Sequence, residues 1–79
     1  MRLDKFLKVS RIIKRRTVAC EACDGSHVSV NGKVAKPSCE VKAGDIISIR
    51  FGEKTLNVRV KEVREHAFKD DAAELYEVI

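Results

Sequence analysis

The apolar residues of this 79-residue chain change their spacing near residue 27. Before that point they recur every three or four residues, as in Leu3, Phe6 and Leu7, which is the spacing of an amphipathic helix. After it they alternate with polar residues, which is the spacing of a strand with one buried face. The change predicts an α+β fold, in which two short N-terminal helices lie on a small, mostly antiparallel β-sheet.

The first helix is expected over residues 2 to about 10. Its buried face would consist of Leu3, Phe6, Leu7 and Ser10, with Phe6 in the core. Its exposed face would consist of Asp4, Lys5, Lys8 and Arg11. On that exposed face, Asp4 and Lys8 are expected to form a weak i,i+4 ion pair.

The second helix is expected over residues 15 to 24, and Ile12 and Ile13 would pack the turn before it. Its apolar stripe would consist of Val18, Ala19, Ala22 and Cys23. Gly25 follows this stripe and is predicted to end the helix in the left-handed conformation that glycine favours.

The strands are expected from residue 27 onward. Asn31-Gly32 is a strong hairpin signal, so residues 27 to 30 and 33 to 36 are predicted to pair, and Pro37 ends the return strand. Further strands are expected at residues 46 to 51 and 55 to 63, with a last strand at 75 to 79. Residues 64 to 74 are polar and contain at most a short helical turn at 71 to 74.

The length of the chain predicts one domain over residues 1–79, with a thin core and little room for an enclosed active site, because so short a chain buries only about 60% of its unfolded surface. Neither a membrane-spanning run nor a signal peptide is visible. We therefore expect a cytoplasmic monomer that does not bind membranes and whose three cysteines stay reduced.

Positive charge gathers at the N-terminus. Seven of the 16 lysines and arginines lie in residues 1–16 beside a single carboxylate, so this segment carries +6 and the rest of the chain −2. A basic end on a slightly acidic body is typical of a protein that binds a polyanion by one face. Lys14, Arg15 and Arg16 also stand at the start of the second helix, where free N–H groups favour phosphate.

The residues expected to bind RNA phosphates are Arg2, Lys5, Arg11, Lys14, Arg15 and Arg16, with Lys33 at the hairpin as a further contact. Lys8 is expected to serve Asp4 instead. Tyr76 and Phe68 are too few and too distant from the basic segment to form a base-stacking platform, which favours recognition of RNA shape and backbone.

Cys20 and Cys23 have the C-x-x-C spacing of metal and redox sites. A structural zinc ion needs four ligands, however, and Cys39, His27 and His66 are scattered single residues. A redox motif of this kind would follow a strand, and none is expected here. The interpretation we favour is that the two cysteines act as small hydrophobic residues, with no cofactor and no metal. The remaining alternative is a small zinc-dependent adaptor.

Four motifs resemble a known family in their order and approximate spacing. They are Arg2-Leu3-Asp4-Lys5-Phe6-Leu7, Arg16-x-x-Ala19, Val28-x-Val30-Asn31-Gly32-Lys33 and Val41-x-x-Gly44-Asp45-x-Ile47. Together they resemble the alpha-L RNA-binding domain family, named from small-subunit ribosomal protein S-four. The resemblance covers residues 2 to about 60 and leaves residues 64–79 as a C-terminal extension. The family's glycine after the second helix would fall at Ser26, one residue later than Gly25.

The resemblance is strongest to stand-alone members that act in bacterial ribosome-associated quality control. It implies a non-catalytic protein that binds the large ribosomal subunit carrying peptidyl-tRNA, through ribosomal RNA and tRNA phosphates. It further implies alanine tailing of stalled chains beside the factor RqcH on the same subunit. The alternatives are subunit recycling, as in the related fifteen-kilodalton heat-shock protein, and generic binding of structured RNA. No nucleophile, base and carboxylate arrangement predicts an enzyme.

Overall fold

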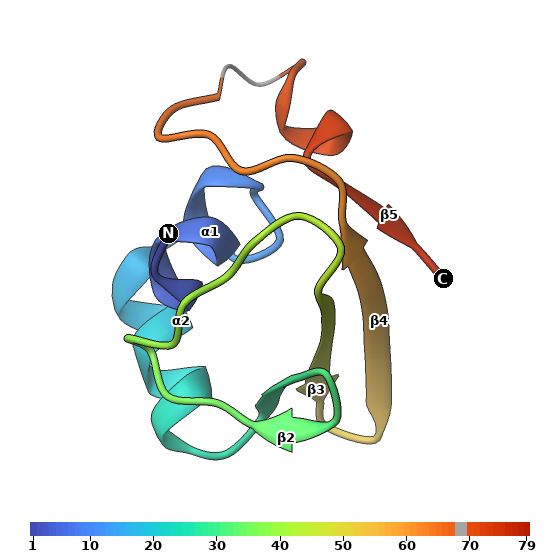
Figure 1. The fold of residues 1–79 in the computed structure, drawn as a ribbon. Helices are drawn as coiled ribbons and strands as arrows, with labels where there is room; N and C mark the ends of the chain where they lie inside the picture. Colours follow the sequence, from blue (N-terminus) through green and yellow to red (C-terminus); the bar gives the residue numbers. More distant parts are fainter. Residues whose placement is uncertain (68–69) are drawn as a thin grey trace.

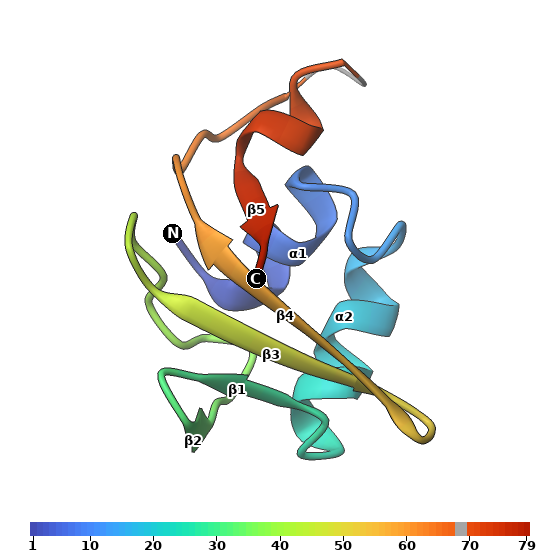
Figure 2. The same ribbon diagram turned by 90° about the vertical axis from the view of Figure 1, so that its right-hand side faces the viewer.

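The two helices precede the sheet in the chain and lie together on one of its sides (Figures 1 and 2). The computed structural model describes residues 1–67 and 70–79. Helix α1 covers Leu3–Val9 and helix α2 covers Arg16–Asp24, within one residue of the predicted ranges at all four ends. In the described part of the chain, no helix has the length and apolar character needed to cross a membrane.

Five strands form one antiparallel sheet in the order β2-β1-β3-β4-β5. The strands are β1 Val28–Val30, β2 Lys33–Val34, β3 Ile46–Phe51, β4 Lys54–Val60 and β5 Tyr76–Val78. A short 3-10 helix, Ala72–Glu74, lies where a helical turn was predicted. The predicted α+β architecture is confirmed. Phe68, which was named in the prediction about base stacking, lies outside the described residues.

Strand β4 ends at Val60, earlier than the predicted end at Val63. The reason is the register, because Ile46, the first residue of β3, pairs with Arg59. In the described part of the chain, no strand continues the ladder on that side beyond Val60. The N–H groups of Lys61 and Glu62 instead donate to the carbonyl oxygen of Leu75, at 2.8 and 3.2 Å.

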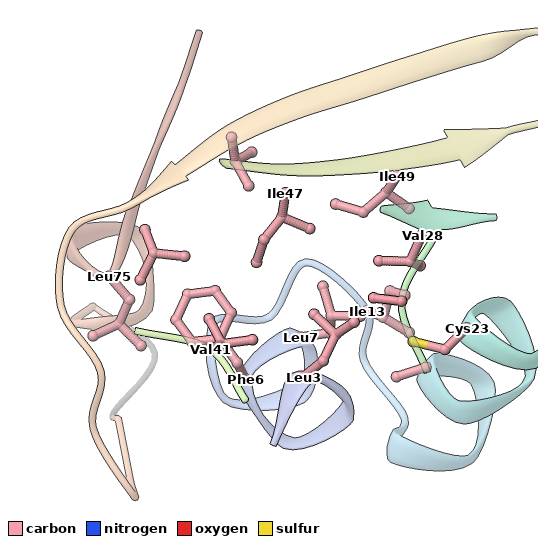
Figure 3. Packing of buried hydrophobic residues seen from close by; sticks show 14 residues of the cluster. Leu3, Phe6, Leu7, Ile13, Cys23, Val28, Val41, Ile47, Ile49 and Leu75 are labelled. Carbon is pink, nitrogen blue, oxygen red and sulfur yellow. The ribbon is translucent and has the colours of Figure 1, made fainter. Parts of the chain in front are cut away.

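The core lies between the helices and the inner face of the sheet (Figure 3). Leu3, Phe6 and Leu7 of α1 are fully buried, as predicted. They lie in one cluster with residues from three strands and from the segment before β5, which are Val28, Ile47, Ile49, Val58, Val60 and Leu75. On α2 the inner residues are Ala19 and Cys23. The prediction that Val18 belongs to this stripe is wrong, because Val18 is 46% exposed.

The two turn motifs of the sequence are bonded to each other. At the predicted hairpin, Asn31 and Gly32 both have positive φ, 52° and 84°, as a type I′ turn requires. The Asn31 side chain accepts the N–H of Ile46 and donates to the Asp45 carboxylate, at 3.0 and 3.1 Å. Asp45 also accepts the N–H of Lys42 at 3.0 Å. The hairpin tip is thereby fixed to the turn that starts β3.

The end of α2 differs from its prediction. Gly25 has an ordinary φ of −81°, and Ser26 takes the left-handed conformation with φ 62°. The N–H of His27 donates to the carbonyl oxygen of Ala22 and that of Ser26 to Cys23, which are the two bonds of a Schellman motif. These backbone bonds determine where the chain turns, although the left-handed residue is a serine and not a glycine. Ser26 stands at the position where the alpha-L RNA-binding domain family has its glycine.

The first residues of the chain bond to residues 37–41, so that α1 is fixed at its start. The N–H of Leu3 donates to Cys39 and the N–H of Val41 donates to Met1, both at 2.8 Å. Arg2 forms an antiparallel bridge with Glu40. The backbone of Arg2 is extended, so Arg2 precedes α1 and does not belong to its first turn.

Candidate functional site

The basic groove is an open hollow of about 670 Å³ between the helices and the segment after β4. Five cations line it, Lys5, Lys8, Arg11, Lys14 and Arg16. The other lining residues are Val9, Glu65, His66 and Ala67. Five cations against a single carboxylate leave this hollow with a charge of +4 when His66 is neutral. An excess of this size concentrates anions at the surface.

The turn between α1 and α2 orients the middle of the groove. Ser10 and Ile13 are buried, and Ile13 belongs to the core cluster. Between them Arg11 takes a left-handed backbone conformation with φ 62°, an unusual one for a residue with a side chain. With the apolar residues of the turn held inside, Arg11 and Lys14 are left exposed on the outer side.

Asp4 lies between the helices and not on the exposed face. Its side chain is only 2% exposed, so its prediction as a surface partner of Lys8 is wrong. Its two oxygens accept hydrogen bonds from the start of α1 and from α2. The donors to Oδ1 are the Lys5 N–H at 2.8 Å and Arg2 Nε at 3.2 Å. The donors to Oδ2 are Cys20 Sγ at 3.1 Å, Arg16 Nε at 3.3 Å and Arg2 Nη2 at 3.3 Å.

The charge of Asp4 is set by two opposing effects. Burial raises the pKa of this carboxyl group, because a charged form loses hydration. The hydrogen bonds from Cys20, Arg16 and the Lys5 N–H, with the Arg16 charge, outweigh burial and leave the pKa below its ordinary value. Asp4 is therefore ionised at neutral pH and orients both arginines electrostatically.

Arg16 donates to Asp4 through Nε alone, whereas Arg2 donates through Nε and Nη2. Their side chains remain 53% exposed for Arg2 and 46% for Arg16. Among the described residues, the terminal amino groups of Arg16 have no acceptor. Since a guanidinium matches a phosphate through paired N–H groups, this arrangement leaves a fork ready for an external anion.

One carboxylate lies inside the groove. Glu65 forms an ion pair with the ammonium group of Lys5. The hydrogen bond and the charge of Lys5 lower the pKa of Glu65. The segment after β4 thus supplies an anion that partly offsets the positive charge of the groove.

The predicted RNA-binding residues fall into three groups. Lys5, Arg11, Lys14 and Arg16 line the basic groove. Arg2 joins them through Asp4. The other two predicted residues, Arg15 and Lys33, do not line the groove.

Arg15 is the exposed residue before α2, and Lys33 lines a separate hollow with Lys36 and Lys42. Sequence reasoning missed Lys8 and His66 as groove residues. The signal for Lys8 was its spacing of three residues from both Lys5 and Arg11, which places all three on one helical face. No sequence signal indicated His66.

The C-x-x-C pair divides between two surroundings. Cys23 is 3% exposed and lies in the apolar core, and burial raises the pKa of its thiol to about 11. Cys20 faces Asp4, whose hydrogen bond and negative charge raise its pKa as well. Metal binding and redox exchange need thiolates, which both surroundings disfavour. Among the described residues, no three His, Cys, Asp or Glu side chains are grouped to hold a metal ion.

Known proteins are similar to this chain in sequence and in fold. The S4 domain matches residues 1–47. The chain belongs to the S4 domain family. This S4 domain is 51% identical to the RQC P-site tRNA stabilizing factor of Bacillus subtilis over 79 residues, covering 100% of the chain and 92% of that relative. It is 56% identical to the factor of the same name in Streptococcus pneumoniae, covering 100% of the chain and 90% of the relative.

A solved structure supports the fold of this S4 domain over its whole length. The trimeric structure of Vibrio cholerae heat shock protein 15 superposes with a TM-score of 0.92 at 31% identity, covering 100% of this chain and 81% of that one. The sequence-based assignment to the alpha-L, ribosomal protein S4 type of domain is confirmed, with the quality-control factors closer in sequence than the heat-shock protein.

Proposed function

We propose that the basic groove binds the phosphate backbone of structured RNA. The observation that carries this proposal is the gathering of five cations in one hollow with a single opposing carboxylate. Arg16, and Arg2 beside it, would provide forked contacts to phosphate oxygens, while Lys5, Lys8 and Lys14 would provide point charges. The described groove lining contains no Phe, Tyr or Trp. Binding would therefore follow RNA shape and charge rather than stacked bases.

The RNA is proposed to be that of a large ribosomal subunit carrying peptidyl-tRNA. Support comes from the two relatives of 51% and 56% identity, each named as a factor that stabilises the P-site tRNA. In this role the protein would act as a non-catalytic, monomeric and cytoplasmic single domain. It would contact ribosomal RNA and tRNA and support ribosome-associated quality control. The finer proposal is that it assists alanine tailing by RqcH on the same subunit.

A second candidate function is recycling of large subunits, as a factor of the heat-shock type. The whole-chain likeness to the Vibrio cholerae heat shock protein 15 favours it. Both functions use the same groove, so they differ in the state of the subunit that is bound. Pull-down of the tagged protein from cells, followed by analysis of the attached nascent chains, would separate them, because alanine tails are expected only in the first case.

Sedimentation of the protein with isolated large subunits tests the groove. We expect the double variant Lys14→Ala/Arg16→Ala to bind more weakly and to lower the slope of log affinity against log salt by about 2, since each neutralised phosphate contributes about one. Lys54→Ala is the matched control, because Lys54 is exposed at the start of β4 and does not line the groove. If the double variant and the control bound equally well, with the same slope as the wild type, the groove would not be the binding face.

A further inference from the structure

Cys20 is the one member of the C-x-x-C pair that faces a charged group. Its thiol lies 3.1 Å from Oδ2 of Asp4. The same oxygen accepts Nε of Arg16 and Nη2 of Arg2. We propose that the Cys20 thiol is a positioning group for RNA binding, which fixes the Asp4 carboxylate so that Arg2 and Arg16 are held in one orientation. The proposal rests on the proposed function of the basic groove.

The helix geometry explains how Cys20 reaches this position. Arg16 and Cys20 are four residues apart on α2, so they lie one above the other on the same helical face. That face meets α1 at Asp4. Cys23, three residues after Cys20, points into the core instead and provides the packing that the motif was expected to give.

Two donors hold the carboxylate from the protein side. The N–H of Lys5 holds Oδ1 and the thiol of Cys20 holds Oδ2. The terminal torsion of an aspartate is broad, so a carboxylate bonded only to mobile guanidinium groups could rotate with them. With one donor on each oxygen, the plane of the carboxylate is fixed before either arginine bonds to it. The arginines then meet an acceptor of defined direction.

A neutral donor suits this position better than a charged one. Asp4 already faces two arginines, and a third cation would compete with them for the same oxygen. An apolar side chain would leave Oδ2 without an inner partner. The hydrogen bond to Asp4 also keeps the thiol protonated at neutral pH, so that it remains a donor under the conditions in which RNA is bound.

The test compares two substitutions at this residue. Cys20→Ala removes the donor, and Cys20→Ser replaces the thiol by a hydroxyl that donates to the same oxygen. Cys39→Ala is the matched control, because the Cys39 thiol faces the backbone carbonyl of Glu40 and not Asp4. Each variant is titrated with a fluorescein-labelled RNA stem-loop and with isolated large subunits. We expect Cys20→Ala to bind about three- to tenfold more weakly, the effect of leaving long side chains to be ordered on binding. Cys20→Ser and Cys39→Ala should bind like the wild type.

An NMR measurement on the free protein tests the positioning without RNA. The Nε–H signals of Arg2 and Arg16 should be protected from solvent exchange in the wild type and in Cys20→Ser, and should lose protection in Cys20→Ala. Unchanged signals in Cys20→Ala would overturn the proposal, as would wild-type affinity of that variant. If neither the wild type nor any variant binds either RNA probe, the proposed function of the groove fails. If the Nε–H signals nevertheless change as expected, the positioning of the two arginines by Cys20 still stands.

Discussion

Replacing Ser26 by glycine should stabilise the protein. Ser26 has φ 62°, a conformation that costs a residue with a side chain about 1–2 kcal/mol and glycine almost nothing. Among the described residues its hydroxyl has no hydrogen-bond partner, so Ser26→Gly would remove no side-chain hydrogen bond. The bonds from the N–H groups of Ser26 and His27 to Cys23 and Ala22 involve only the backbone and would remain.

The expected gain is the difference between two terms. Relief of the left-handed conformation favours the variant, while the greater freedom of glycine in the unfolded chain costs about 0.4–1 kcal/mol. The net increase in the free energy of unfolding should be about 0.5–1 kcal/mol. In a domain of this size, such an increase raises Tm by about 2–8 °C.

Chemical denaturation of three proteins tests this reasoning. Ser26→Ala is the matched control, because alanine removes the hydroxyl but retains the Cβ atom that makes the conformation costly. We expect its midpoint to stay near that of the wild type while the midpoint of Ser26→Gly rises. Should Ser26→Gly be no more stable than Ser26→Ala, the assignment of residue 26 as the left-handed end of α2 would be refuted.

Three further outcomes follow from the structure. Glu65→Gln removes the anion paired with Lys5, so RNA titrations should give about two- to fivefold tighter binding at low salt, and the difference should vanish at high salt. The free energy of unfolding should fall by about 2–3 kcal/mol as the pH rises from about 9 to about 11. The reason is that burial raises the pKa of Cys23 in the folded protein, so the unfolded chain loses the thiol proton first. Urea titrations of Cys23→Ala should lack this part of the loss. Phe6→Ala should cost about 3–5 kcal/mol by calorimetry, whereas Phe51→Ala, which changes a half-exposed side chain, should cost less than about 1 kcal/mol.

The residue spacing predicted both layers of the fold because burial follows the period of each element. Leu3, Phe6 and Leu7 had to face a common side in any helix, and the alternation after residue 27 could be satisfied only by a sheet with one buried face. The hairpin was predictable for a local reason, since Asn31-Gly32 accepts the positive φ angles of its turn. These predictions needed no knowledge of distant contacts.

The position of Asp4 could not be predicted in the same way. The spacing of apolar residues along a helix predicts a carboxylate on the exposed face, since burying an unpaired charge is costly. Here that cost is offset by Arg2 and by a second arginine, Arg16, from the next helix. The basic cluster itself was predictable from charge, but the sharing of one carboxylate by two arginines required the crossing of the helices.

The position of Arg15 and Lys33 outside the basic groove has a similar cause. Sequence shows that charges are near one another along the chain, but not which side of a turn each one faces. Arg15 precedes α2 and does not line the groove, and Lys33 lines the separate hollow with Lys36 and Lys42. Lys8 was assigned to Asp4, and the burial of Asp4 leaves it free to join the groove.

The bonding of the first residues to residues 37–41 also determines when a newly made copy is ready to act. Translation delivers the two helices first, but their apolar faces have no sheet to cover them until β3 and β4 have followed. The start of α1 is fixed only when Val41 is available to bond to Met1. The groove is complete only when Glu65 and His66, which form part of its wall, have also left the ribosome. Each copy therefore acquires its basic groove only after residues 65 and 66 have been made, although all five cations of the groove lie within residues 1–16.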